Sequence, residues 1–158
     1  IEEESSKDIV LSTPAAGEII DLSEVNDPTF ASGSLGEGFA IIPTDGKIYS
    51  PVNGEVSTVF PTKHAIGVVS EEGAEILIHI GIDTVNLNGK YFQSAVSDGK
   101  KVRKGDLLME VDLQELIKEG YDPTTMVIVT NSSRFKNIIT SHKKNNQTRK
   151  LASLGGSI

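Results

Sequence analysis

Short apolar runs, separated by turn residues, recur along most of this 158-residue chain. The runs are only three to seven residues long and rich in β-branched side chains, which favours strands over helices. Turn pairs such as Asn53-Gly54 and Asp98-Gly99 separate them. The pattern predicts an all-β fold, an antiparallel β-sandwich or barrel-like hybrid with one or two short helices. Its expected strands are residues 9–11, 18–20, 39–42, 47–49, 55–60, 65–69, 76–82, 107–111 and 126–130.

Helix signals are scarce. Residues 112–119 can form two helical turns, with Asp112 as the N-cap and Gly120 as the stop. Residues 132–139 predict a second short turn or helix, and the basic, polar residues 142–150 indicate a loose tail or linker. We expect a polar lead-in over residues 1–8, a single domain over residues 9–142 and a flexible polar tail over residues 143–158.

Charge and composition exclude several classes of protein. The longest nearly continuous apolar run, residues 76–82, is far shorter than the roughly 20 residues of a membrane-spanning helix. The formal net charge is −7 and no basic face is visible outside the tail, so we expect a basic protein partner and no nucleic acid.

The absence of cysteine excludes thiolate chemistry. No secretory signal opens the sequence, which favours a cytoplasmic location.

One histidine, His79, interrupts the most apolar of the runs. A strand this apolar is buried or nearly so, and its imidazole must then find hydrogen-bond partners. Leaving it unpaired would cost roughly 1–3 kcal/mol. A core histidine bonded to the backbone and a functional histidine both fit this position. His142, in contrast, is most simply a solvated residue of the basic tail.

A second histidine, His64, precedes the neighbouring strand. If residues 71 and 72 form a two-residue hairpin loop, His64 lies directly opposite His79 and the rings share one face of the sheet. Thr62, two residues earlier, then shares that face. A shift of one residue would place the rings on opposite faces. Because Glu-Glu is unfavourable in a two-residue turn, a longer loop stays open as an alternative.

Two facing imidazoles can bind a metal, act as general acid and base, or pair a nucleophile with a charge-stabilising neighbour. The residues beside His79 are Ile78 and Ile80, with Leu77 two positions back, so the His-x-His pattern of a zinc peptidase is missing. The chain also lacks a Gly-x-Ser-x-Gly elbow and an ATP-binding phosphate loop. We therefore expect no metal and no cofactor.

Two segments, residues 60–67 around His64 and residues 76–85 around His79, resemble the active-site motifs of a known family. With further matches at residues 12–18, 35–41, 50–54, 102–112 and 127–131, the resemblance covers roughly residues 9–140. The chain resembles the glucose-type IIA domains of the bacterial phosphoenolpyruvate-dependent sugar phosphotransferase system.

This resemblance implies a phosphotransferase component with a phosphohistidine intermediate. The carrier protein HPr would donate a phosphoryl group to Nε2 of His79, and the group would pass to a IIB domain for sugar uptake. His64 would donate a hydrogen bond to the phosphoryl oxygens, and Thr62 would fix the tautomer of His64. The absence of an arginine or of a Mg²⁺-binding acidic cluster beside His79 agrees with a labile phosphoryl group.

The resemblance also implies a docking face for both partners. Asp83 would meet a basic residue of HPr. Phe30, Phe60 and Val85 match an apolar ring around the site, with ordinary packing as the alternative for these three. Contact with a membrane would come only through a fused or associated permease.

Two other functions stay open. The same domain, fused to a sugar symporter or a regulator, would use phosphorylation of His79 to modulate its neighbour instead of relaying the group. A β-rich carrier-like domain without transfer chemistry would leave His79 unphosphorylated. Residues 50–56 and 98–108 resemble strings of biotinyl and lipoyl carriers, although the chain lacks their lysine-bearing hairpin.

Overall fold

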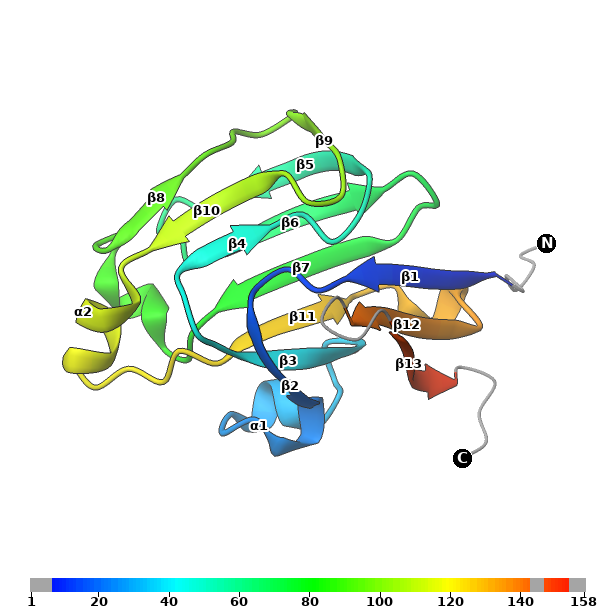
Figure 1. Ribbon diagram of the computed structural model, residues 1–158, viewed down its shortest axis with the longest axis horizontal. Coiled ribbons are helices and arrows are strands. Elements are labelled where there is room, and N and C mark those ends of the chain that lie inside the picture. The colour runs from blue at the N-terminus through cyan, green and yellow to red at the C-terminus, as the bar shows by residue number, and fades with distance from the viewer. Residues whose placement is uncertain (1–6, 143–146, 154–158) are drawn as a thin grey trace.

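The computed structural model describes residues 7–142 and 147–153, whose strands form three sheets. Neighbouring strands pair antiparallel except for β1 and β12, which are parallel. The all-β expectation is therefore confirmed, with one parallel pair that the sequence did not predict (Figure 1).

The largest sheet has seven strands in the order β2-β3-β11-β7-β6-β5-β9. All but β9, which pairs over two residues, coincide with a predicted run. Their bounds are β2 Gly17–Asp21, β3 Glu37–Pro43, β11 Thr125–Val129, β7 Glu75–Ile80, β6 Ala65–Ser70, β5 Gly54–Val59 and β9 Lys101–Val102.

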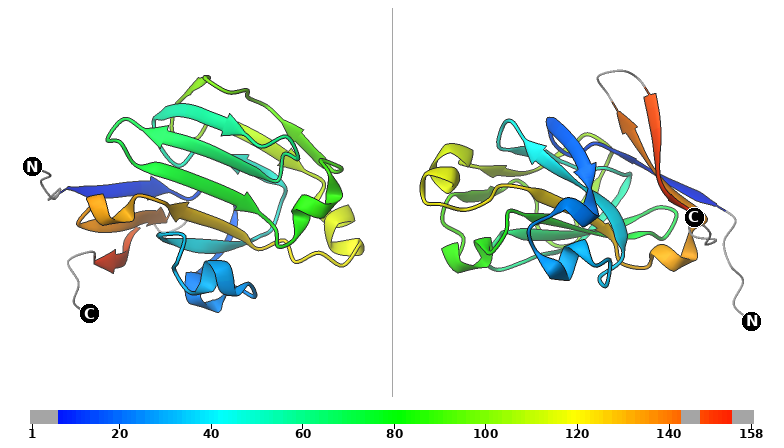
Figure 2. Two further views of the ribbon diagram at one scale, coloured as in Figure 1. Left: turned by 180° about the vertical axis from the view of Figure 1, so that it is seen from behind. Right: turned by 90° about the horizontal axis from the view of Figure 1, so that it is seen from below.

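Two three-stranded sheets complete the fold, in the orders β4-β10-β8 and β1-β12-β13. Figures 1 and 2 show β4, β10 and β8 layered over the β5 and β6 part of the large sheet, with α1 beside β2 and β3. The bounds are β4 Lys47–Tyr49, β8 Phe92–Ser94, β10 Leu107–Val111, β1 Asp8–Ser12, β12 Asn137–His142 and β13 Gln147–Ser153.

The short helices follow local capping signals. Helix α2, Leu113–Lys118, is capped by Asp112, whose carboxylate accepts from the N–H of Glu115, and ends before Gly120 at φ +94°. This confirms the predicted helix. Helix α1, Pro28–Ala31, was not predicted, because one helical turn shows no periodicity. Single 3₁₀ turns occupy Leu22–Glu24, Thr84–Leu87 and Ser132–Arg134.

The central strands β7 and β11 separate two apolar clusters. Ile76, Ile78 and Ile80 of β7 face the main core between the sheets. On the opposite face, Leu77 packs against a smaller cluster that contains Phe30 of α1 and Met126 of β11. Strand alternation places His79 on this second face, beside the α1 segment and outside the main core.

The hairpin of β6 and β7 corrects the predicted register. Its loop has three residues, because Gly73 adopts φ +93° and the N–H of Ser70 bonds to the carbonyl of Ala74 at 2.9 Å. Ala65, not His64, therefore lies opposite His79. The predicted direct pairing of the two histidines is wrong by one residue, and the longer loop is the one that forms.

The C-terminal part also differs from expectation. Only Ser132–Arg134 form a helical turn within the predicted segment 132–139, whose end belongs to β12. Residues 147–153 form β13 against β12, where a loose tail was predicted. Residues 1–6, 143–146 and 154–158 of the predicted lead-in and tail lie outside the described residues. Within the described ranges, no helix combines the length and apolarity that crossing a bilayer requires.

Candidate active site

His79 is held at the end of β7 with one ring nitrogen already occupied. Its Nδ1 lies 2.9 Å from the carbonyl oxygen of Gly81. A carbonyl can only accept, so Nδ1 carries the hydrogen and, in the neutral ring, Nε2 carries the lone pair. The ring of Phe30 packs against the imidazole with 4.8 Å between centroids. His79 therefore presents an unprotonated Nε2 from a half-buried ring.

His64 reaches His79 because the chain leaves the regular strand just before β6. Lys63 adopts φ +62°, and its N–H bonds to the carbonyl of Phe60 at 2.7 Å in a tight turn. The carbonyl of His64 accepts from the N–H of Ile80 at 2.7 Å. The two imidazoles meet edge to face with 4.8 Å between centroids and an 84° interplanar angle. The predicted juxtaposition of the rings is confirmed, although the predicted register is not.

Thr62 orders the second imidazole. Its Oγ1 lies 2.6 Å from Nδ1 of His64, the contact expected between a tautomer-fixing hydroxyl and its histidine. When the hydroxyl donates to Nδ1, the hydrogen of neutral His64 resides on Nε2 and can be donated to a ligand. Phe60 packs edge-on against the His64 ring, 5.7 Å between centroids. The pair therefore places an unprotonated ring nitrogen of His79 beside a hydrogen-bond donor on His64.

Burial keeps both rings neutral. Loss of water lowers the pKa of His64, and it is also the largest cause that lowers the pKa of His79 to about 4. The nearby His64 lowers the pKa of His79 further, whereas the Gly81 hydrogen bond and the carboxylates of Asp27 and Asp83 raise it. Because the lowering causes win, His79 has a free electron pair at neutral pH.

The residues around the rings fall into a wall and a rim. Phe30 is buried against His79, whereas Phe60 is partly exposed beside His64. Val85 is 47% exposed, so this apolar side chain is available to a partner. Asp83 is exposed in a left-handed conformation, φ +63°, between Gly81 and Val85. The structure thus gathers all of the sequence-predicted site residues around the two imidazoles or on the adjoining turn.

Two participants were missed at the sequence level. Asp27 caps α1, accepting from the N–H of Thr29 at 3.0 Å, and acts electrostatically on His79. The Asp27-Pro28 step is a helix-start signal that could have located this carboxylate. The carbonyl of Gly81 had no comparable signal, because every residue carries a carbonyl and only the backbone path brings this one to His79.

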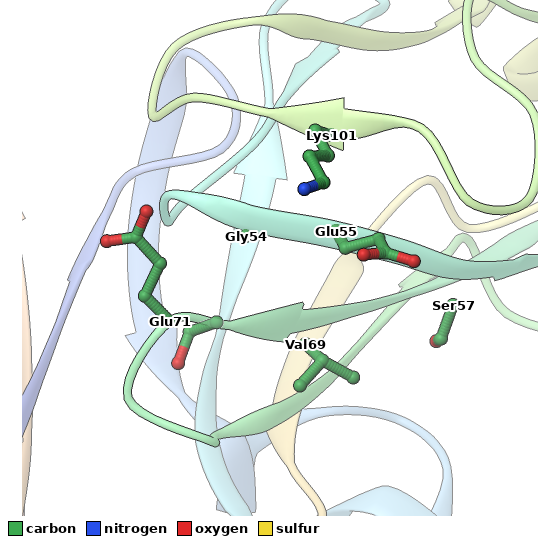
Figure 3. A pocket seen from close by; sticks show the side chains of 7 residues that line it. Gly54, Glu55, Ser57, Val69, Glu71 and Lys101 are labelled. Carbon is green, nitrogen blue, oxygen red and sulfur yellow. The ribbon is translucent and has the colours of Figure 1, made fainter.

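A surface hollow elsewhere does not compete with this site. It is lined by residues of β5, β6 and β9, including Glu55 and Lys101, and by Glu71 of the β6–β7 loop (Figure 3). It lies mostly toward the hairpin end of β6, where the lining residues Val69 and Ser70 are five and six residues from His64, about 17 to 20 Å along an extended strand, and it reaches Ser57 beside Gly67. Across residues 7–142 and 147–153, no group of three or more metal-ligating side chains gathers to hold an ion.

Comparisons with known proteins agree with this geometry. Residues 9–135 match the family model described as phosphoenolpyruvate-dependent sugar phosphotransferase system, EIIA 1. A glucose-specific EIIA component of Oceanobacillus iheyensis is 46% identical over 87% of this chain and 84% of the relative. A solved glucose permease IIA from Mycoplasma capricolum superposes with a TM-score of 0.71 at 42% identity, covering 77% of this chain and 79% of that one.

Larger relatives contain the same unit. A beta-glucoside-specific EIIBCA component of Halalkalibacterium halodurans is 48% identical over 85% of this chain but only 21% of the relative. The chain thus spans about a fifth of the length of this multi-component relative. The match over most of the chain shows that it belongs to the glucose-type EIIA family of the sugar phosphotransferase system.

Proposed function

We propose that Nε2 of His79 accepts a phosphoryl group from phosphorylated HPr and passes it to a IIB domain. The supporting observation is the hydrogen bond from Nδ1 of His79 to Gly81, which leaves Nε2 as the free nucleophile. The phosphorus–nitrogen bond of the donor breaks as the bond to Nε2 forms, and the donor imidazole keeps the electron pair. No proton has to move at His79, because Nδ1 retains its hydrogen.

His64 stabilises the transferred group in this proposal. Its Nε2–H donates to a phosphoryl oxygen, and Thr62 holds the tautomer that makes the donation possible. One neutral donor suits a carrier, since a cage of cations would make the phosphohistidine too stable to pass on. The partly apolar surroundings, with Phe30 against His79 and Phe60 against His64, limit the access of water to the phosphoramidate.

Both partners use the same face in turn. Phe60 and Val85 offer apolar contact, and the exposed carboxylate of Asp83 meets a basic residue of HPr. Phe30 packs against the His79 ring and does not meet the partner directly, because it is buried and offers little surface of its own. We place the domain on the cytoplasmic side of the membrane, free or tethered through a permease.

The test is to incubate the protein with phosphoenolpyruvate, enzyme I and HPr, and to locate the label by mass spectrometry at neutral to alkaline pH. Label on His79 that disappears in His79→Gln but persists in His64→Gln supports the assignment. A folded wild-type protein that acquires no label on any histidine contradicts it.

A second step separates relay from regulation. The labelled protein is mixed with a IIB domain, and the loss of label from His79 is followed. Rapid loss in wild type, slowed in His64→Gln, supports relay. A stable label in the presence of active IIB supports the alternative, in which phosphorylation of His79 modulates a neighbouring transporter or regulator.

A further inference from the structure

The orientation of His79 depends on a backbone turn, because its Nδ1 partner is a carbonyl and not a side chain. Gly81, which supplies that carbonyl, adopts φ +82°, and Asp83 follows with φ +63°. Both are left-handed conformations, and for the non-glycine residue this conformation is strained. The surroundings must therefore impose this turn for the Gly81 carbonyl to reach His79.

Thr84 closes the inner side of the turn. Its side chain has no exposed surface, and its hydroxyl donates to the carbonyl of Ile80. Its methyl group packs against Gly81 so closely that a Cβ added at Gly81 would lie 2.5 Å from Cγ2 of Thr84. One side chain therefore both fills the turn and joins its two ends.

The outer side of the turn is held by backbone alone. The N–H of Gly81 donates to the carbonyl of Thr124 and that of Ile82 to the carbonyl of Asp122, each at 3.0 Å. The carboxylate of Asp122 in turn accepts from the N–H and the hydroxyl of Thr124 at 3.0 and 2.6 Å. These bonds fix the N–H groups of Gly81 and Ile82, which flank the Gly81 carbonyl. The hydroxyl of Thr84 is the group that joins the end of the turn to its start at Ile80.

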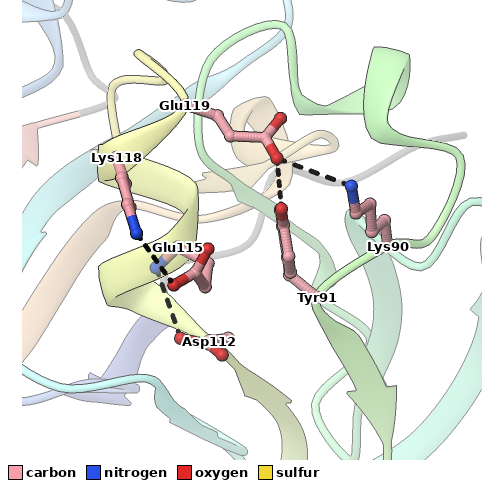
Figure 4. Close-up of polar contacts among 6 residues, drawn as sticks. All are labelled: Lys90, Tyr91, Asp112, Glu115, Lys118 and Glu119. Carbon is pink, nitrogen blue, oxygen red and sulfur yellow. Dashed lines mark hydrogen bonds and ion pairs between the residues drawn. The ribbon is translucent and has the colours of Figure 1, made fainter.

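The segment that follows Thr84 is also fastened. The hydroxyl of Tyr91 donates to Glu119 after α2 (Figure 4). Tyr91 also adopts φ +78°, and its carbonyl accepts from the N–H of Asp112 at 2.9 Å. Of the described residues, the non-glycine positions with positive φ are Lys63, Asp83, Asn88 and Tyr91, and the first two lie in the turns directly before His64 and directly after Gly81. Such strain persists only where surrounding contacts over-determine the backbone.

We propose that Thr84 is a positioning residue for His79: its hydroxyl holds the turn that aims the Gly81 carbonyl at Nδ1, and so keeps the lone pair on Nε2. The alternative is a purely structural role, in which Thr84 stabilises the fold without affecting the tautomer. The inference rests on the proposed function only in its effect on phosphoryl transfer, because the tautomer exists without phosphate.

The test compares Thr84→Val, which keeps the shape and removes the hydroxyl, with Thr84→Ser, which keeps the hydroxyl. Ser50→Ala is the matched control, because Ser50 is equally buried and its hydroxyl donates to the carbonyl of Val52 at 2.7 Å. The first readout is the pair of imidazole ¹⁵N chemical shifts of His79 at neutral pH, assigned with His79→Gln. The second is single-turnover phosphorylation by phosphorylated HPr, and denaturation measures stability.

We expect a mixture of tautomers at His79 in Thr84→Val and about a fivefold slower phosphorylation, the factor that one hydrogen bond is worth. Thr84→Ser should restore the Nδ1–H tautomer, and Ser50→Ala should lose stability alone. A wild-type tautomer in folded Thr84→Val overturns the proposal. If wild-type protein shows the Nδ1–H tautomer but never accepts phosphate, the proposed function fails while the positioning role stands.

Discussion

At the residue scale, opposing influences set the protonation of His79. Burial and the neighbouring imidazole of His64 lower its pKa to about 4, against the raising effects of the Gly81 hydrogen bond and of Asp27 and Asp83. A neutral ring keeps Nε2 nucleophilic. It also couples folding to pH, because the same histidine in an unfolded chain has the ordinary pKa of about 6.5.

The coupling predicts a difference between wild type and His79→Gln. Between pH 6.5 and 4 the unfolded chain binds a proton at His79 that the folded chain does not, so stability present above this window is lost as pH falls. From pH 7 to pH 5, wild type should lose up to about 2 kcal/mol more unfolding free energy than His79→Gln. Urea denaturation at both pH values measures it, and equal losses would show that burial does not depress this pKa.

Sequence patterns predicted which side chains form the site, but not the backbone path that brings them together. Two histidine motifs and a threonine two residues before His64 sufficed to place His79, His64 and Thr62 together. The route to that contact was not predictable, because it depends on Lys63 at φ +62°, and lysine carries no signal for a left-handed backbone. The Gly81 carbonyl escaped for the same reason, since its role depends on a backbone path.

At the element scale, glycines shape the β6–β7 hairpin at both ends, for different reasons. Gly73 permits the three-residue loop, and a Cβ there would meet nothing within 4 Å. Gly81 ends β7 beside the site, and a Cβ there would lie 2.5 Å from Thr84 and 3.2 Å from the carbonyl oxygen of Asp122. Gly73 is therefore required by its backbone angle alone. Gly81 is required by its backbone angle and also because its neighbours leave no room for a Cβ atom.

Alanine at the two positions should separate these requirements. Gly73→Ala should cost about 1 kcal/mol of stability, the penalty of a left-handed alanine, and leave phosphorylation unchanged. Gly81→Ala should cost more and also slow phosphorylation, because relieving the clash displaces the carbonyl that orients His79. Denaturation and the phosphorylation assay give both quantities. Equal effects of the two variants would argue against a special role for the Gly81 turn.

Elements that bury a strong apolar pattern were the predictable ones. Strand β11 is buried at every position from Thr125 to Val129, so its apolar run stood out in the sequence. Strand β9 is two residues long, and β13 is largely polar, so neither carries a hydrophobic period. The hairpin register was missed because β6 and β7 carry apolar residues on both faces, so their alternation does not decide between a two-residue and a three-residue loop until the angle of Gly73 is known.

At the scale of the whole molecule, acidic charge is distributed over more than the site. The net charge is −7, and Asp27 and Asp83 act on His79 from two different segments. Glu55 and Glu71 line the hollow at the opposite end of the large sheet (Figure 3). Long-range attraction of a basic donor depends on the summed field, whereas docking depends on the charges next to the rings.

Neutralising each pair in turn should distinguish the two effects. We expect phosphorylation by HPr to slow as salt is raised from 0.05 to 0.5 M, since the Debye length falls below about 10 Å. Asp27→Asn with Asp83→Asn should lower the low-salt rate and flatten this dependence, while asparagine at position 27 can still cap α1. Glu55→Gln with Glu71→Gln removes the same charge about 20 Å from His64 and should change the rate far less. Stopped-flow or quenched-flow assays at several salt concentrations measure the phosphorylation rate of wild type and of both double variants. Equal changes of rate in the two variants would mean that the net charge governs the encounter, and not the carboxylates next to the rings.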